Sequence, residues 1–374
     1  MRILGISTEH DSSVSIINDG QLEYFCKEER LTKDKRDNKP WVVLMDALKS
    51  AKGVIDKATI SSPTSDDPWL EYLKSFLGKI LNVEIIDYSD KHHLCHASLA
   101  FYNSGFEEAL CLVIDRDGSI INNFMRESES VFRVSYKNGF EILHKNYWVF
   151  NNGVDFEGKK VEIINSLNKK GFKFNIDSSL SITKIYESAT TLIGQNALEN
   201  GKTMGLSSYG KSSNSLKLFN DGRPLDYLFT HSNFIDSINS PLLTNHLNKI
   251  NKDINQNNYK FYANYAYKVQ QQTQLEVLNL IKTYIQKTKI TNVCISGGYG
   301  LNVISNYFLK KSLPSINFYM EPLADDSGNS IGSSYHLYRK ISKDNTIYKK
   351  ENDFLGKKYS LNQIEKEIIK YLEK

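Results

Sequence analysis

The chain has 374 residues, of which 24% are charged and 40% hydrophobic, and its formal net charge is +4. This length allows a large core in one bilobal domain or in two domains, whereas so small a net charge does not by itself indicate nucleic-acid binding. No apolar run reaches the length of a membrane span, and the N-terminus has no signal-peptide core and instead predicts a first strand. The four cysteines form no CxxC pair and no disulfide-like framework, which favours a cytoplasmic location.

The first part of the chain predicts a three-stranded meander at 2–7, 14–17 and 21–26. His10 and Asp11 lie in its first, polar turn, which resembles the turn that holds phosphate or substrate in actin-like sugar kinases. An ordinary hairpin explains the same residues. The charged stretch 27–36 is typical of a solvated segment.

Helices and strands then alternate along the chain. The spacing of apolar residues predicts helices at 41–51 and 68–81, and strands at 58–60 and 83–86. This alternation indicates a mixed sheet that is covered by helices on its faces.

A dense cluster of histidines follows, with three imidazoles in the five positions 92–96. His92 and His96 are four residues apart, so a helix would place them on one face, within reach of a single ion. The apolar run 109–114 predicts a buried strand that ends at Asp115. Two imidazoles and a strand-end carboxylate suggest a metal site, and structural or solvated imidazoles at a helix start are the alternative.

The second half of the chain repeats the three-strand pattern of the first. Strands are predicted at 111–114, 120–126 and 130–136, and this second meander suggests a duplicated, two-lobed fold. The weakly patterned stretch 150–185 indicates either a variable surface loop, which we favour, or an insertion that forms part of an acceptor pocket or lid. A helix is predicted at 187–198, before a glycine-containing turn at 201–210, and the polar stretch 212–258 predicts surface loops and short helices.

A long helix is predicted at 262–287 and a buried strand at 292–295. The strand leads into Gly297 and Gly298 and then a helix, an arrangement that can bind an anion or nucleotide through free backbone N–H groups. Glycines at such a turn are also often structural. A last core strand at 316–320 ends in a second acidic turn, and helices are predicted at 330–339 and 360–374.

Seven ordered motifs carry a resemblance to a known family. They are His10-Asp11-x-Ser13, Glu28-Glu29-Arg30-x-Thr32-x-x-Lys35, His92-His93-x-x-His96-Ala97, Asp115-x-x-Gly118, Met204-Gly205-Leu206-x-x-Tyr209-Gly210, Ser296-Gly297-Gly298-x-x-Leu301-Asn302 and Asp326-Ser327-Gly328. From Arg2 to about Arg339, the chain resembles the NodU/CmcH-type carbamoyltransferases. The resemblance implies an α/β, actin-like (ASKHA) fold of two duplicated lobes with mixed sheets flanked by helices. We expect the first lobe at 1–110, the second lobe with the glycine-rich nucleotide turn at 111–345, and a linker and helix at 346–374.

In such enzymes carbamoyl phosphate and ATP form carbamoyladenylate, and the carbamoyl group then moves to an acceptor hydroxyl of a small molecule, sugar or nucleotide. The resemblance implies a divalent ion, commonly iron, and places His93 outside its ligands. This mixed set also suits Mn²⁺ or Zn²⁺. The implied ligands are His92, His96, Asp115 and Asp326.

The resemblance also implies roles around the substrates. His10 and Lys35 would contact the carbamoyl or phosphate portion, and Asp115 or His10 is a candidate base for the acceptor hydroxyl. Lys202 either approaches the nucleotide or is a surface lysine. The residues assigned to the nucleotide are Ser13, Gly297, Gly298 and Asn302.

One departure bears on the activity. Full-length members of the family carry a second domain that resembles threonylcarbamoyladenylate synthases, and this chain stops at Lys374, about where that domain would begin. We expect a fragment, a separate partner protein that supplies the adenylate, or a changed activity. A tRNA-type threonylcarbamoyl transferase and a non-catalytic metal- or nucleotide-binding subunit are the alternative functions, and a homodimer remains open.

Overall fold

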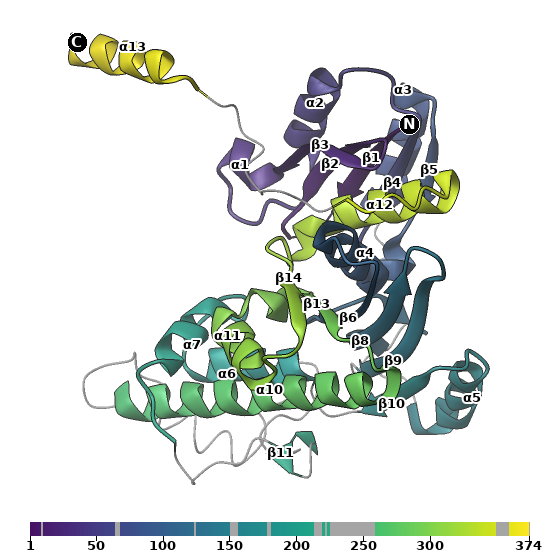
Figure 1. Cartoon of the computed structure of the whole chain (residues 1–374), viewed down its shortest axis with the longest axis vertical. Helices are drawn as coiled ribbons and strands as arrows, with labels where there is room; N and C mark the ends of the chain where they lie inside the picture. Colours follow the sequence, from purple (N-terminus) through teal and green to yellow (C-terminus); the bar gives the residue numbers. More distant parts are fainter. Residues whose placement is uncertain are drawn as a thin grey trace.

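Two mixed β-sheets, each flanked by helices, form the protein, and helices α4 and α12 lie between them (Figure 1). The computed structural model describes residues 1–8, 10–63, 68–122, 125–149, 156–177, 181–212, 219–220, 223–224, 259–348 and 359–373.

The first sheet has the strand order β3-β2-β1-β4-β5. Its strands are β1 (Arg2–Ser7), β2 (Ser13–Asn18), β3 (Gln21–Lys27), β4 (Lys57–Ser61) and β5 (Glu84–Asp87). The first three strands are antiparallel, and β4 and β5 continue the sheet in parallel with β1. Helices α2 (Trp41–Ser50) and α3 (Pro68–Leu81) pack their apolar stripes into one core with this sheet, as their spacing predicts.

The second sheet repeats this plan with the order β10-β9-β8-β6-β13-β14. Its strands are β6 (Glu108–Ile114), β7 (Ile120–Ile121), β8 (Met125–Ser135), β9 (Gly139–Val149), β10 (Lys173–Asp177), β13 (Asn292–Ser296) and β14 (Asn317–Met320). An antiparallel meander of β6, β8 and β9 is again followed by two strands parallel to its first strand. The repeated plan confirms the expected duplicated, actin-like fold of two lobes.

Helices α4 (His92–Ser104) and α12 (Asn329–Ser342) connect the two sheets. Ile331 and Tyr335 of α12 join the core of the second sheet, whereas Leu337 and Tyr338 pack near Ile3 of the first. A Cβ atom on Gly332 would lie 2.0 Å from the Cys95 carbonyl oxygen, so only glycine allows this close approach of α12 to α4. The expected lobe boundaries at 110 and 345 stay predictions.

The other face of the second sheet is covered by α10 (Tyr259–Thr288), together with α6 (Ile182–Leu192), α7 (Asn200–Ser207) and α11 (Val303–Ser312). Helix α13 (Leu361–Leu372) follows separately (Figure 1). None of the helices in the described ranges has the length and apolar character needed to cross a membrane. The remaining elements are α1 (Glu28–Thr32), η1 (Ser89–Lys91), α5 (Phe156–Asn168), β11 (Phe219–Asn220), β12 (Arg223–Pro224), η2 (Gly298–Leu301) and η3 (Asp326–Gly328).

The second meander differs from its prediction. The strands predicted at 120–126 and 130–136 are instead the short strand β7 and the long strand β8, which is continuous through the polar residues 127–129, and β9 is the third strand of the meander. Glu127 and Glu129 are buried in β8 because each has partners: Glu127 pairs with Lys145, and Glu129 accepts hydrogen bonds from Ser128 and Asn146. Partners on the neighbouring strand make polar residues compatible with a buried strand.

Four further stretches also differ from their predictions. The expected loop at 150–185 contains α5, β10 and the start of α6, and the expected turn at 201–210 is mostly α7. The helix predicted at 187–198 begins earlier, at Ile182. The charged stretch 27–36 is largely exposed, as predicted, and differs only in containing α1, in which buried Glu28 accepts hydrogen bonds from the first turn of α2, at the Val42 and Val43 N–H groups. The predicted loops at 212–258 lie largely outside the described residues.

Candidate metal centre and adjoining cavity

The two histidines predicted to share a helix face lie at the start of α4. The backbone N–H of His92 donates to Ser119 Oγ at 2.9 Å, which satisfies a donor at the helix start, and α4 ends at Gly105 with a positive φ. His92 and His96 are 1% and 0% exposed, and their Nε2 atoms lie 3.2 Å apart. One helical turn therefore points both imidazoles at the same buried place.

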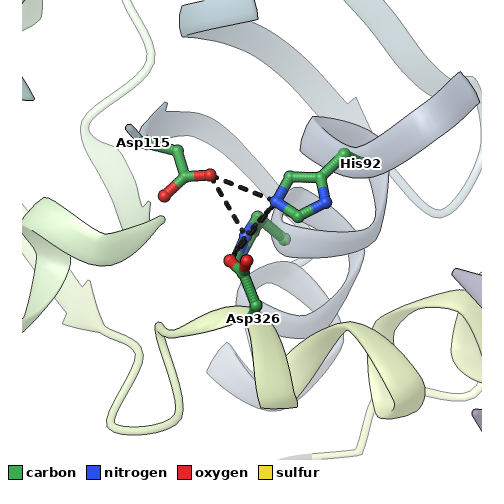
Figure 2. Close-up of side chains that lie close together, drawn as sticks. His92, Asp115 and Asp326 are labelled. Carbon is green, nitrogen blue, oxygen red and sulfur yellow. Dashed lines mark hydrogen bonds and ion pairs between the residues drawn. The ribbon is translucent and has the colours of Figure 1, made fainter. Parts of the chain in front are cut away.

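Two carboxylates complete the cluster from distant parts of the chain (Figure 2). Asp115 directly follows β6, and Asp326 begins η3 after β14. His92 Nε2 lies 3.1 Å from Asp115 Oδ2 and 3.3 Å from Asp326 Oδ1, and His96 Nε2 lies 3.4 Å from Asp326 Oδ1. The four ligand atoms all lie within 4.8 Å of one another.

This geometry fits a bound divalent ion. Bonds of about 2.1 Å to a metal place neighbouring ligand atoms about 3.0 Å apart in an octahedron and about 3.4 Å apart in a tetrahedron. The measured separations fall in this range for His92 with each of its three neighbours. Two imidazoles and two carboxylates are a donor set that Fe²⁺, Mn²⁺ and Zn²⁺ accept.

The charges at the cluster favour a cation. Burial by itself lowers the pKa of His92, but the Asp326 and Asp115 carboxylates outweigh it and raise that pKa to about 10. Burial likewise opposes ionisation of Asp115 and Asp326, yet the imidazoles hold the pKa of both carboxyls below the usual value. Both carboxylates are therefore ionised at neutral pH and attract positive charge between them.

His93 points elsewhere. Its Nδ1 atom lies 2.6 Å from Ser130 Oγ, and burial lowers its pKa to about 3, so the imidazole is neutral. This placement is consistent with a structural role and not with a metal ligand.

The glycine turn after β13 supports Asp115. Gly297 has φ +83°, and a Cβ atom there would lie 2.5 Å from the Ile114 carbonyl oxygen. The next backbone N–H, of Gly298, donates to Asp115 Oδ1 at 3.0 Å. The Gly298 N–H therefore orients a candidate metal ligand and is not free to bind an anion, although the sequence of this turn suggests an anion site.

A cavity of about 510 Å³ adjoins the cluster, and Asp115 and Asp326 form part of its wall. Its walls come from both lobes, and the Arg36 guanidinium of the first lobe donates to the Leu198 carbonyl oxygen of the second at 2.9 Å. The lining residues are His10, Asp11, Glu29, Lys35, Arg36, Pro63, Asp115, Arg116, Asp117, Arg126, Thr183, Tyr186, Leu198, Asn200, Gly201, Met204, Gly298, Tyr299, Leu301, Asn302, Asp325 and Asp326.

Both residues predicted to contact the carbamoyl or phosphate portion, His10 and Lys35, line this cavity. His10 Nδ1 lies 2.9 Å from Asp11 Oδ2, and its Nε2 lies 3.7 Å from Asp326 Oδ2. The hydrogen bond to Asp11 raises the pKa of His10, against the opposing effect of burial, to about 9. Lys35 is exposed at the cavity wall.

The predicted nucleotide residues divide into two groups. Gly298 and Asn302 line the cavity, and the Asn302 side chain also caps α11 by accepting the Ser305 N–H at 3.0 Å. Ser13 is fully buried, does not line the cavity, and donates to the Ser327 carbonyl oxygen at 2.6 Å. Lys202 is exposed on α7, lies outside the lining, and pairs with Glu199 at 2.8 Å. The structure does not bring Ser13 or Lys202 to the cavity, and Gly297 is likewise absent from its lining.

Sequence reasoning missed several residues of the site. Arg116 directly follows Asp115, and Asn329 directly follows the Asp326-Ser327-Gly328 motif, so both are next to residues that the motifs contain. Arg126 lies within β8 and Tyr299 within the glycine turn, and only the folded chain places them on the cavity wall.

Known proteins resemble this chain in sequence and in fold. Residues 70–335 match the family described as carbamoyltransferase N-terminus. The chain is 22% identical to the uncharacterized protein sll1178 of Synechocystis over 97% of its own length and 62% of that protein.

Two solved structures share the fold. Full-length HypF in its phosphate- and nucleotide-bound form has a TM-score of 0.54 and 13% identity, over 91% of this chain and 55% of HypF. HypF of T. kodakarensis has a TM-score of 0.57 and 12% identity, over 91% of this chain and 48% of HypF. The chain thus spans about half to three fifths of the length of these proteins. Because the family match covers well over half of its residues, the chain belongs to the carbamoyltransferase N-terminus family.

Proposed function

We propose that this chain transfers a carbamoyl group from carbamoyladenylate to an acceptor hydroxyl in the cavity between the lobes. The observation that carries the proposal is the convergence of His92, His96, Asp115 and Asp326, two of which also form the cavity wall. These four residues would hold a divalent ion, Fe²⁺ in the first place and Mn²⁺ or Zn²⁺ as alternatives. When bound, such an ion polarises a carbonyl oxygen as a Lewis acid.

The transfer makes one bond and breaks one. The acceptor oxygen attacks the carbamoyl carbon, the bond from that carbon to the phosphate oxygen breaks, and AMP leaves with the electron pair. The hydroxyl proton must pass to a base within hydrogen-bond reach. Asp115, which is ionised at neutral pH, lines the cavity and is the proposed base. His10 lines the same cavity with a raised pKa, so it is protonated at neutral pH and, with Lys35, stabilises negative charge on the carbamoyl or phosphate portion.

We place the nucleotide along the wall formed by Gly298, Leu301 and Asn302. HypF, which shares the fold, has been solved in a phosphate- and nucleotide-bound form, and this supports the binding of a nucleotide by this chain. Carbamoyl phosphate and ATP would be the source of the adenylate.

The supply of carbamoyladenylate is part of the proposal. Since the chain spans only part of the length of its relatives, we propose that the adenylate is made outside this chain, by a further part of a longer protein or by a separate partner protein. The acceptor is a hydroxyl-bearing small molecule, sugar or nucleotide.

The test uses two donors side by side. The chain, loaded with Fe²⁺ or Mn²⁺, is incubated with preformed carbamoyladenylate or with carbamoyl phosphate and ATP, and a panel of alcohols, sugars and nucleotides is screened by mass for the gain of one carbamoyl group. We expect product from the preformed adenylate. Absence of product with every acceptor, in a protein that retains metal and nucleotide, would favour a non-catalytic binding subunit.

Matched variants locate the activity. His96→Ala should lose both the metal and the product, whereas His144→Gln removes another buried imidazole away from the cavity wall and should retain both. Full metal stoichiometry in His96→Ala would contradict the ligand assignment.

A further inference from the structure

We propose that Asn329 is a fifth ligand of the metal ion, which it binds through its side-chain oxygen Oδ1. This inference rests on the proposed metal centre and adds a residue that the four converging ligands do not include.

The position of Asn329 follows from the fold. It is the first residue of α12, three residues after Asp326, and its side chain is 0% exposed. The contact at Gly332 holds α12 against α4, and the ligands His92 and His96 lie on α4. The start of α12 is thereby fixed over the histidine face of α4.

The distances place the Asn329 amide against both candidate ligand imidazoles. Asn329 Nδ2 lies 3.2 Å from His96 Nε2 and 3.4 Å from His92 Nε2. These separations match those among the four ligand atoms, for example 3.2 Å between the two imidazole nitrogens and 3.3 Å from His92 Nε2 to Asp326 Oδ1. Nδ2 also lies 3.4 Å from His92 Nδ1, so the amide lies over the His92 ring and within ligand-to-ligand distance of both Nε2 atoms.

The chemistry of its neighbours decides which end of the amide faces the ion. The two ends have nearly the same shape, but only the oxygen has lone pairs for a cation. Once both imidazole Nε2 lone pairs are bound to a metal, they cannot accept a hydrogen bond from Asn329 Nδ2. The amide oxygen Oδ1 is buried without a hydrogen-bond partner in the described structure. Turning the amide over breaks no hydrogen bond of Oδ1 and gives that oxygen a cation as its partner.

A neutral oxygen ligand also bears on metal choice. Structural Zn²⁺ sites are mostly tetrahedral, with four protein ligands, whereas oxygen donors suit Mn²⁺ and other harder ions that take higher coordination numbers. Five protein ligands favour Fe²⁺ or Mn²⁺ over a closed tetrahedral Zn²⁺ site.

The experiment measures metal binding and needs no turnover. Mn²⁺ binding to the full chain is followed by calorimetry for the native protein, Asn329→Ala, Asn329→Asp and Asn103→Ala. We expect Asn329→Ala to raise the Kd by about 10–100-fold. Asn329→Asp keeps an oxygen at the same place and should restore tight binding. Asn103→Ala removes another buried amide, bonded to Glu321 and away from the ligands, and should bind as the native protein does.

A spectrum reports the coordination number independently. The visible absorption of bound Co²⁺ strengthens as its coordination number falls, so Asn329→Ala should show a more intense band than the native protein. An unchanged Kd and an unchanged Co²⁺ band in Asn329→Ala would overturn the proposal. So would an Asn329→Asp variant as weak as Asn329→Ala, because that result assigns the role to the amide N–H.

Two controls keep these results interpretable. If Asn329→Ala does not fold, a crystal structure of the native Mn²⁺ complex decides: Oδ1 within about 2.3 Å of the ion supports the proposal, and an Oδ1 outside the coordination shell overturns it. The His96→Ala variant separates the two levels of inference. If His96→Ala retains the metal, the assignment of the metal centre itself is wrong. If His96→Ala loses the metal and Asn329→Ala binds it with the native Kd, only the assignment of Asn329 as a fifth ligand is wrong.

Discussion

The substitution Gly297→Ala tests the turn after β13, whose Gly298 N–H donates to Asp115. Gly297 has φ +83° and ψ 161°, a conformation that is essentially restricted to glycine. Forcing alanine into it costs about 1–3 kcal/mol. The new Cβ would also lie 2.5 Å from the Ile114 carbonyl oxygen, and relieving such overpacking costs about 1–3 kcal/mol more. We therefore expect the free energy of unfolding to fall by roughly 2–6 kcal/mol.

The chain supplies a matched control in Gly139→Ala. Gly139 also has a positive φ, +70°, but a Cβ atom there would meet nothing within 4 Å. Its substitution should cost only the backbone strain, about 1–2 kcal/mol. The difference between the two variants isolates the steric contact with Ile114.

Urea denaturation followed by circular dichroism measures both variants, and Mn²⁺ calorimetry shows whether the shifted turn disturbs Asp115 through the Gly298 N–H. We expect weaker metal binding in Gly297→Ala and native binding in Gly139→Ala. Equal destabilisation of the two variants would refute the steric argument, and native metal affinity in a folded Gly297→Ala would refute the support of Asp115 by this turn.

Three further predictions concern stability. Lys145→Met leaves the buried carboxylate of Glu127 without its partner, so the free energy of unfolding measured in urea should fall by about 3–5 kcal/mol. The double variant with Glu127→Leu should recover most of this loss. A double variant as unstable as Lys145→Met would show that the uncompensated charge is not the cause. Burial, with Lys173 and Lys287, lowers the pKa of His144 from 6.5 to about 4, so the unfolded chain takes up a proton first as the pH falls. The native protein should lose up to roughly 3 kcal/mol between pH 6.5 and 4, and a His144→Phe variant with the same pH profile would speak against this. Mn²⁺ at about 100 times its Kd should stabilise the native protein by about 2.7 kcal/mol in thermal unfolding, and equal stabilisation of His96→Ala would place the ion elsewhere.

Much of the fold could be predicted from local patterns. The meander at the N-terminus, α2, α3 and the strand–glycine–helix unit after α10 follow apolar patterns in consecutive residues, which is why they could be predicted. The errors arose where local composition misleads. Glu28, Glu127 and Glu129 predict solvent exposure by type, but each is buried with partners that lie 14 to 53 residues away along the chain.

The candidate site likewise has features that local sequence predicts and features that depend on distant parts of the chain. The spacing of His92 and His96 predicts that they share a face wherever the segment is helical, because residues four apart meet on a helix, and the apolar runs predict that Asp115 and Asp326 each follow a strand. That these two aspartates meet depends on the folded chain, because 211 positions separate them and only the pairing of β6 with β13 and of β13 with β14 brings the two strands into one sheet. The folded chain also leaves Ser13 and Lys202 out of the cavity lining and brings Asn329 against the two imidazoles. The position of Asn329 depends on how closely α12 packs against α4, and that distance is set by contacts between residues that are remote in sequence.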